Sequence, residues 1–185
     1  IGGLRDRHRL HPRYTAGCDR AAHLGASVRP IRRIIVHHAA ATATLEEIDA
    51  WHLARGWSGV GYHFVVEKDG LIRLGRPVHV QGAHARFHNA DTIGVCVAVD
   101  ARDGVPALAW RALVSLVHDL MRQHQIPQDG VVGHRDVGST VCPGFQVGQL
   151  FDRDPSVVTM SDDRRDSTDR RRPVPVDVNT SLPEV

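Results

Sequence analysis

A histidine and a cysteine, His134 and Cys142, share the turn-rich stretch GHRDVGSTVCPG, and both side chains are borderline-soft donors that suit zinc. Far upstream, the apolar run IIV ends in the histidine pair His37 and His38. Three protein ligands leave a fourth position open for water, as in catalytic zinc sites, whereas structural sites are normally closed by four. The sequence therefore predicts a catalytic zinc site built from one histidine of the pair together with His134 and Cys142.

The two adjacent histidines compete for one ligand position. Residues 31–36 read as a strand, and neighbouring strand residues point to opposite faces, so only one of His37 and His38 can face the metal. Bound zinc lowers the pKa of water toward neutrality and polarises a carbonyl oxygen. Hydrolysis of an amide needs both effects, because an amide is a poor electrophile with a poor leaving group.

Four blocks of the chain, in order, resemble those of the zinc amidases that cut N-acetylmuramoyl-L-alanine bonds. That family includes phage amidase-type lysozymes and animal peptidoglycan recognition proteins. The blocks are a first zinc block, a catalytic-tyrosine block, a substrate-loop block in two parts and a last zinc block: 36–39, 57–64, 82–85 with 89–94, and 133–144. Together they span residues 31–150 and are far more specific in this order than any single motif.

The resemblance implies one Zn2+ ion held by His37, His134 and Cys142, with His38 packed or hydrogen bonded behind the site. It implies a catalytic role for Tyr62, whose hydroxyl would orient water or stabilise the oxyanion; packing as a half-buried strand residue is the alternative.

Four further residues take their expected roles from the same resemblance. Thr140 stands where phage lysozymes carry a lysine, so it can donate a hydrogen bond to an oxyanion but supplies no positive charge, which leaves the proton donor open. His84 and Asn89 are expected to line the groove and bind polar groups of the substrate. Trp57 is expected to wall the groove, with core packing as the alternative.

The implied activity is zinc-dependent hydrolysis of the amide between the lactyl group of N-acetylmuramic acid and L-alanine. The main alternative is a recognition module that binds peptidoglycan without cutting it; such relatives typically lack the cysteine, and Cys142 and Tyr62 both favour the enzyme. A polymerase-regulating partner and a zinc-stabilised structural domain are weaker alternatives. We expect a monomer that binds peptidoglycan or muropeptides, and neither nucleic acid nor a membrane.

The expected fold is α/β, a single domain with a mixed central β-sheet flanked by helices and flexible tails. The strand-like segments are 31–36, 62–67, 71–74, 92–99 and 131–132, and the helical segments are 44–56 and 107–124. Thr44 and Glu47 fit a capping box at the start of the first helix, whose inner face is marked by Leu45, Ile48 and His52. The second helix carries an apolar stripe of Leu113, Leu116, Val117, Leu120 and Met121. We expect an arginine-rich arm at 1–30, the amidase domain at 31–154 and a disordered charged tail at 155–185. A chain of residues 31–155 is expected to keep zinc and catalysis.

The composition gives further indications of the class of protein and of where it acts. The chain has 185 residues and a formal net charge of +2, and a mildly basic surface suits an anionic wall polymer. The number of cysteines, 3, is odd and no CxxC pair occurs, which disfavours a disulfide framework. No signal peptide is visible, although an opening on Ile1 leaves a removed leader open. We expect action on the bacterial cell wall, in the periplasm or outside the cell, after synthesis in the cytoplasm and release.

Overall fold

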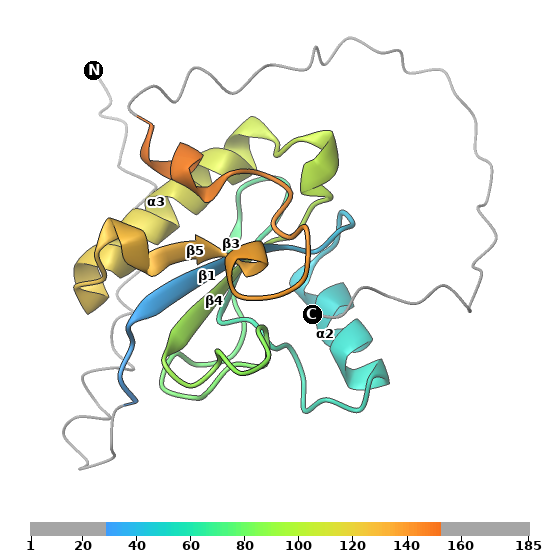
Figure 1. Cartoon of the computed structure of the whole chain (residues 1–185). Coiled ribbons are helices and arrows are strands. Elements are labelled where there is room, and N and C mark those ends of the chain that lie inside the picture. The colour runs from blue at the N-terminus through green and yellow to red at the C-terminus, as the bar shows by residue number, and fades with distance from the viewer. Residues whose placement is uncertain (1–28, 153–185) are drawn as a thin grey trace, which may run out of the picture.

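Five strands form one mixed sheet in the order β3-β2-β4-β1-β5 in the computed structural model, which describes residues 29–152 (Figure 1). Their bounds are β1 Arg33–His38, β2 Phe64–Val66, β3 Ile72–Leu74, β4 Thr92–Val97 and β5 Val131–Gly133. β1 pairs in parallel with both β4 and β5, and β2 pairs in parallel with β4 but antiparallel with β3. The predicted α/β fold with a mixed central sheet is confirmed.

Two helices flank the sheet, α2 at Leu45–Ala54 and α3 at Ala107–His124. The predicted capping box of α2 is present: the Thr44 side chain accepts from the Glu47 amide, and the Glu47 carboxylate accepts from the Thr44 amide. Gly56 follows the helix with φ +80°, a conformation that a side chain would strain. The described residues also contain four short 3-10 helices: Ala101–Asp103, Gln128–Gly130, His134–Asp136 and Val147–Phe151.

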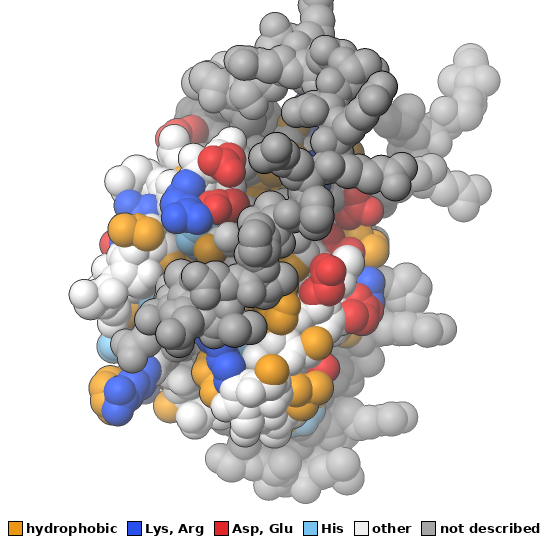
Figure 2. Space-filling model, turned by 90° about the vertical axis from the view of Figure 1, so that its right-hand side faces the viewer, with side chains coloured by type: hydrophobic (Ala, Val, Ile, Leu, Met, Phe, Trp, Pro, Cys, Tyr) orange, Lys and Arg blue, Asp and Glu red, His pale blue; other side chains and the backbone are white. Residues whose placement is uncertain are grey.

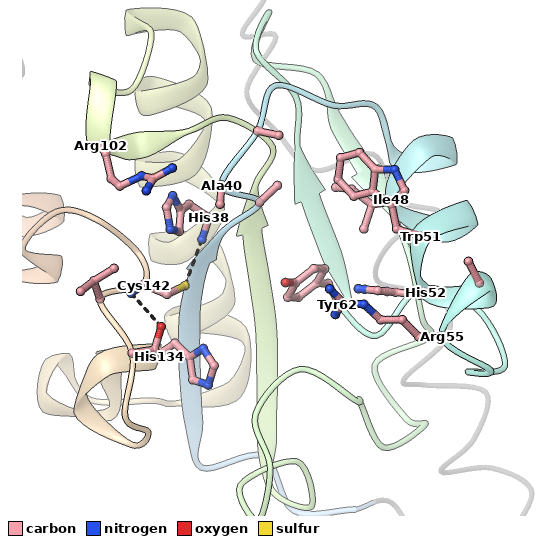
Figure 3. Close-up of a pocket in the computed structure, with 15 residues that line it drawn as sticks. His38, Ala40, Ile48, Trp51, His52, Arg55, Tyr62, Arg102, His134 and Cys142 are labelled. Carbon is pink, nitrogen blue, oxygen red and sulfur yellow. Dashed lines mark hydrogen bonds between the residues drawn. The ribbon is translucent and has the colours of Figure 1, made fainter. Parts of the chain in front are cut away.

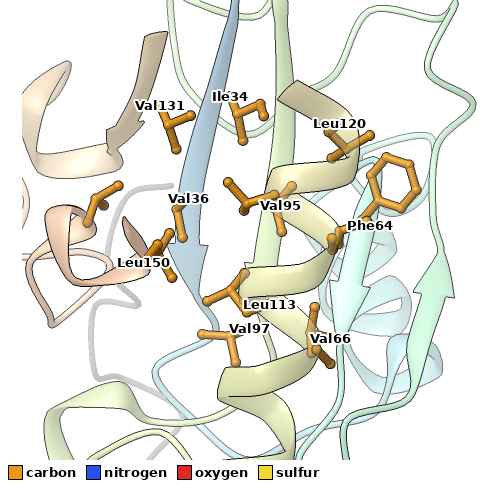
Figure 4. Packing of buried hydrophobic residues seen from close by; sticks show 14 of the residues in the cluster. Ile34, Val36, Phe64, Val66, Val95, Val97, Leu113, Leu120, Val131 and Leu150 are labelled. Carbon is orange, nitrogen blue, oxygen red and sulfur yellow. The ribbon is translucent and has the colours of Figure 1, made fainter. Parts of the chain in front are cut away.

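The main hydrophobic core lies between α3 and one face of the sheet (Figure 4). Alternate residues of the strands, including Val36 and Val95, point toward this helix, because successive side chains of a strand face opposite ways. Leu113, Leu116 and Leu120 meet them and are at most 1% exposed, which confirms the predicted apolar stripe. Each such leucine contributes about 1.5–3 kcal/mol by burial, so this face anchors the sheet.

The opposite face of the sheet carries a smaller apolar cluster and the polar residues of the site. Ile48 of α2 packs there with Val65 and Cys96. His37 lies beside Cys96 in the parallel pairing of β1 with β4 and is fully buried. The β1 histidine that faces α2 is therefore His37, positioned by a strand that is hydrogen bonded on both edges.

Arg29 lies two residues before the expected start of the domain at residue 31, yet it bonds to the loop between β3 and β4. Arg29 donates hydrogen bonds to the carbonyls of Val78, Ala90 and Thr92, at 2.8, 3.1 and 2.9 Å. It therefore fastens the long loop between β3 and β4 to the segment that leads into β1. The rest of the expected arm and the expected tail lie outside the described residues.

Where the described residues are visible in Figure 2, hydrophobic side chains lie among acidic and basic ones. Within residues 29–152, no helix has the length and apolar character needed to cross a bilayer.

Candidate metal centre

Three side chains from distant parts of the sequence meet at one end of the sheet. His37 at the end of β1, His134 after β5 and Cys142 on the following loop are all buried, and their ligand atoms all lie within 4.8 Å of one another. Nδ1 of His37 lies 3.8 Å from Sγ of Cys142. A nitrogen and a sulfur bound to one tetrahedral zinc are about 3.6 Å apart, so the observed spacing fits that ion.

The loop that brings His134 and Cys142 together is held by its own hydrogen bonds. The Arg135 amide donates to the Cys142 carbonyl at 2.7 Å, which closes the loop on itself. The Gly133 amide donates to the Asp136 carboxylate at 2.7 Å, and the Arg135 guanidinium donates to the Phe145 carbonyl at 2.9 Å. Asp136 and Arg135 thus hold the loop backbone and do not bond to the three clustered side chains.

The chemistry of the donor set also fits a metal cation. Burial lowers the pKa of His37, so its imidazole is neutral and offers a lone pair. Burial raises the pKa of the Cys142 thiol to about 11, against smaller lowering effects from the His38 amide and Arg135. A bound cation favours the thiolate strongly and would reverse that effect.

Tyr62 lies beside this cluster. Its ring centroid lies 5.1 Å from that of His37 and 5.6 Å from that of His52, and the residue is 3% exposed. Burial raises the pKa of the Tyr62 hydroxyl well above its usual value. The hydroxyl is therefore protonated at neutral pH and can donate a hydrogen bond, but it cannot act as a general base.

Thr140 lies on the other side of the cluster. Its Oγ1 accepts a hydrogen bond from the Cys142 amide at 3.2 Å. That contact uses an acceptor lone pair and leaves the hydroxyl proton available for donation. Thr140 can therefore hold the cysteine backbone and still donate to a bound oxygen.

A pocket of about 570 Å³ lies beside the cluster, between α2 and the last loop (Figure 3). The lining of this pocket includes Tyr62, His134, Thr140 and Cys142. The remaining lining residues come from the end of β1 and the segment after it, from α2 and the residue that follows it, from the 3-10 helix at Ala101–Asp103 and from the last loop: His38, Ala39, Ala40, Ala41, Ile48, Trp51, His52, Ala54, Arg55, Arg102 and Val141. The lining is largely apolar, with Arg55 on the α2 side of the pocket and Arg102 on the opposite side (Figure 3).

Sequence reasoning did not assign a role to several of these lining residues. Arg55 directly follows the last turn of α2, so the predicted end of this helix could have indicated where Arg55 lies. Arg102 had no such signal, because its place depends on a bidentate pairing with Asp100 at 2.8 and 2.5 Å. His52 was assigned only to the inner face of the helix; it also accepts from the Gly61 amide at 3.0 Å and so ties α2 to the tyrosine block.

The positions of His84 and Asn89 differ from those expected. His84 is 0% exposed and bonds to His37 through its Nδ1, at 3.1 Å from His37 Nε2, so it lies behind the cluster and does not line the pocket. The Asn89 side chain accepts from the amides of His84 and Ala85, at 2.9 and 3.0 Å. Their loop folds inward because these contacts satisfy its polar groups internally.

Trp57 and His38 can be placed as well. Trp57 packs on His52 with ring centroids 4.6 Å apart, is partly exposed, and is not among the residues that line the pocket. His38 accepts from the Ala101 amide through Nδ1 at 3.2 Å, on the other side of β1 from His37.

The fold and this site define the class of peptidoglycan amidases and recognition proteins. Residues 27–145 match the family described as N-acetylmuramoyl-L-alanine amidase. The chain belongs to the N-acetylmuramoyl-L-alanine amidase family. The resemblance read from the sequence is confirmed.

Individual relatives fall into the same two groups. The chain is 30% identical over 135 residues to an endolysin of Klebsiella phage KP32, covering 69% of this chain and 89% of the relative. It is 33% identical over 125 residues to peptidoglycan-recognition protein SC2 of Drosophila melanogaster, covering 61% and 68% respectively.

Solved structures agree with this grouping. The N-acetylmuramoyl-L-alanine amidase LysC from Clostridium intestinale superposes with a TM-score of 0.61 at 33% identity, covering 66% of this chain and 85% of that chain. A mutant of Drosophila PGRP-LB in complex with tracheal cytotoxin gives a TM-score of 0.58 at 29% identity, covering 65% and 80% respectively.

Proposed function

We propose that the protein is a zinc-dependent N-acetylmuramoyl-L-alanine amidase that hydrolyses the bond between the lactyl group of N-acetylmuramic acid and L-alanine. The observation that carries the proposal is the convergence of His37, His134 and Cys142 beside Tyr62, at a pocket that Tyr62, His134 and Cys142 line. The family and the endolysin relatives support the same activity.

Each residue of the pocket has a separate role in this proposal. His37, His134 and Cys142 would hold Zn2+, which supplies activation of water and polarisation of the scissile carbonyl. The buried Tyr62 hydroxyl donates to the oxygen on which negative charge develops. Thr140 accepts from the Cys142 amide, which keeps that backbone in place, and its hydroxyl proton is available to a bound oxygen.

The substrate class follows from the shape and charge of the pocket. Its apolar wall, which includes Ile48 and Trp51, suits the methyl groups of a lactyl-alanine unit, and Arg55 and Arg102 suit an anionic polymer. We propose peptidoglycan or soluble muropeptides as substrates and the bacterial cell wall as the place of action, with the protein acting as a monomer.

Digestion of purified peptidoglycan by the zinc-loaded protein tests this function. Mass spectrometry should detect free stem peptides that begin with L-alanine, together with glycan strands that keep their lactyl groups. Binding to sacculi without any new amino terminus would instead identify a recognition module. Metal analysis of the same preparation should find about one zinc per chain.

A further inference from the structure

A series of three hydrogen bonds runs from His37 away from the pocket and into the sheet. Nε2 of His37 lies 3.1 Å from Nδ1 of His84. Nε2 of His84 lies 3.4 Å from Oγ1 of Thr92, and that hydroxyl donates to the His88 carbonyl at 2.5 Å. His37, His84 and Thr92 are each 0% exposed, so water does not compete for these contacts.

The carbonyl at the far end fixes the direction of every bond in the series. A carbonyl oxygen only accepts, so Thr92 gives it its single hydroxyl proton and can only accept from His84. The His84 proton therefore sits on Nε2, and a neutral imidazole with its proton on Nε2 carries a lone pair on Nδ1. His37 must then donate from Nε2, which leaves the lone pair of its Nδ1 facing Cys142.

The His84 ring occupies a space that glycines keep open. A Cβ on Gly94 would lie 2.4 Å from the ring, and one on Gly82 would lie 2.5 Å from it. Asn89 fixes the backbone on the other side by accepting from the His84 amide. These contacts restrict the ring to the orientation in which it meets both His37 and Thr92.

We propose that His84 and Thr92 are positioning residues that hold His37 as the tautomer with its lone pair on Nδ1, directed at the metal position. This inference rests on the proposed zinc site, because the tautomer matters only if Nδ1 is a ligand atom. Partners of this kind orient ligating histidines and raise metal affinity. His84 thereby acts on the reaction through His37 and not by touching the substrate.

The tautomers are read directly from 15N chemical shifts of the imidazoles in the full chain, freed of zinc with a chelator. The protonated nitrogens of His37 and His84 should both be Nε2. A proton on His37 Nδ1 in the wild-type protein would overturn the proposal without recourse to any variant.

Two substitutions at Thr92 separate positioning from packing. Thr92→Val removes the hydroxyl at nearly constant shape, should mix the tautomers of both histidines, and should weaken zinc binding about 10-fold, as measured by chelator competition. Thr92→Ser keeps the hydroxyl and should restore both readouts. A Thr92→Val protein with unchanged tautomers and zinc affinity would contradict the proposal.

A matched control comes from the opposite face of the sheet. Val117 is 0% exposed in the core under α3, so Val117→Ala lowers stability without touching the series. The Val117→Ala protein should keep wild-type zinc affinity. If it loses as much zinc affinity as Thr92→Val, zinc affinity follows stability alone, and the proposal is wrong. If the wild-type protein binds no zinc, the proposed function fails, whereas the tautomer spectrum still judges the hydrogen-bonded series.

Discussion

The backbone amide of His38 donates a hydrogen bond to Sγ of Cys142 at 3.4 Å. The contact joins the end of β1 to the last loop of the site across 104 positions of the chain. An amide that points at sulfur stabilises the thiolate, and the same contact lowers the pKa of this thiol against the larger raising effect of burial. Because the donor is a backbone group, its effect persists in every side-chain variant of His38.

Cys142→Ala should abolish zinc retention and amidase activity. The melting temperature in excess zinc should fall, because metal binding stabilises the folded state, whereas that of the chelated protein should change less. Cys96→Ala is the matched control, since Cys96 is the other free cysteine within residues 29–152, is buried, and lies outside the cluster. Full zinc content in Cys142→Ala would mean that the ligand is misassigned.

Tyr62→Phe should keep zinc and the fold yet reduce kcat by about 10- to 1,000-fold, because it removes only the hydroxyl that donates to the transition state. The raised pKa of this hydroxyl means that wild-type activity should show no loss from tyrosine ionisation between about pH 7 and 9. Steady-state kinetics on a soluble muropeptide measure both effects. Unchanged turnover would assign Tyr62 to packing against His37 and His52.

Sequence patterns predicted the elements well, because each depends on local physics. The β-branched run before His37, the Thr44 capping box and the leucine stripe of α3 all appear as expected. The strands are shorter than predicted at 64–66 and 92–97, since pairing ends where a partner strand ends. The β1 alternation and the block order together selected His37 over His38.

The loop between β3 and β4 was harder to predict, because its contacts are not local. Nothing near His84 in the sequence shows that Gly94 leaves space for its ring, or that Thr92 accepts its proton. The family resemblance alone led to the expectation that His84 and Asn89 line the groove. Arg29 was missed for the same reason, as its partners lie far along the chain.

Acid should destabilise the fold through its buried histidines. His63 accepts from the Gly94 amide, and burial lowers its pKa from 6.5 to about 4. The unfolded chain therefore binds more protons between these values, so the free energy of unfolding should fall as pH drops through this window. Urea unfolding with chelator present measures the slope, to which His37, His52 and His84 add with the same sign.

His63→Asn isolates one contribution to that slope. The asparagine carbonyl can still accept from the Gly94 amide but does not titrate. Its free energy of unfolding should depend less steeply on pH between about 4 and 6.5 than that of the wild type. If the free energy of unfolding of His63→Asn has the same pH slope as that of the wild type, residues other than His63 titrate in this window.

Removal of Arg29 should weaken the domain, contrary to the expectation that residues 31–155 suffice. Arg29→Ala should cost about 1–3 kcal/mol, because the loop carbonyls of Val78, Ala90 and Thr92 lose a charged donor. Arg29→Lys should recover little, since one ammonium cannot reach all of them. Arg32→Ala is the control, because that side chain is exposed. Equal melting temperatures for chains starting at residues 29 and 31 would contradict this.

The two backbone segments that carry the site differ in rigidity. β1 is paired on both edges, whereas His134 and Cys142 lie on a loop closed by a few hydrogen bonds. Deuterium should therefore enter the amides of residues 134–142 early and those of 34–37 last. Metal loading should slow exchange mainly in the loop. His37 is then the rigid part of the site, and the loop that carries His134 and Cys142 is the part that must close around an incoming ion.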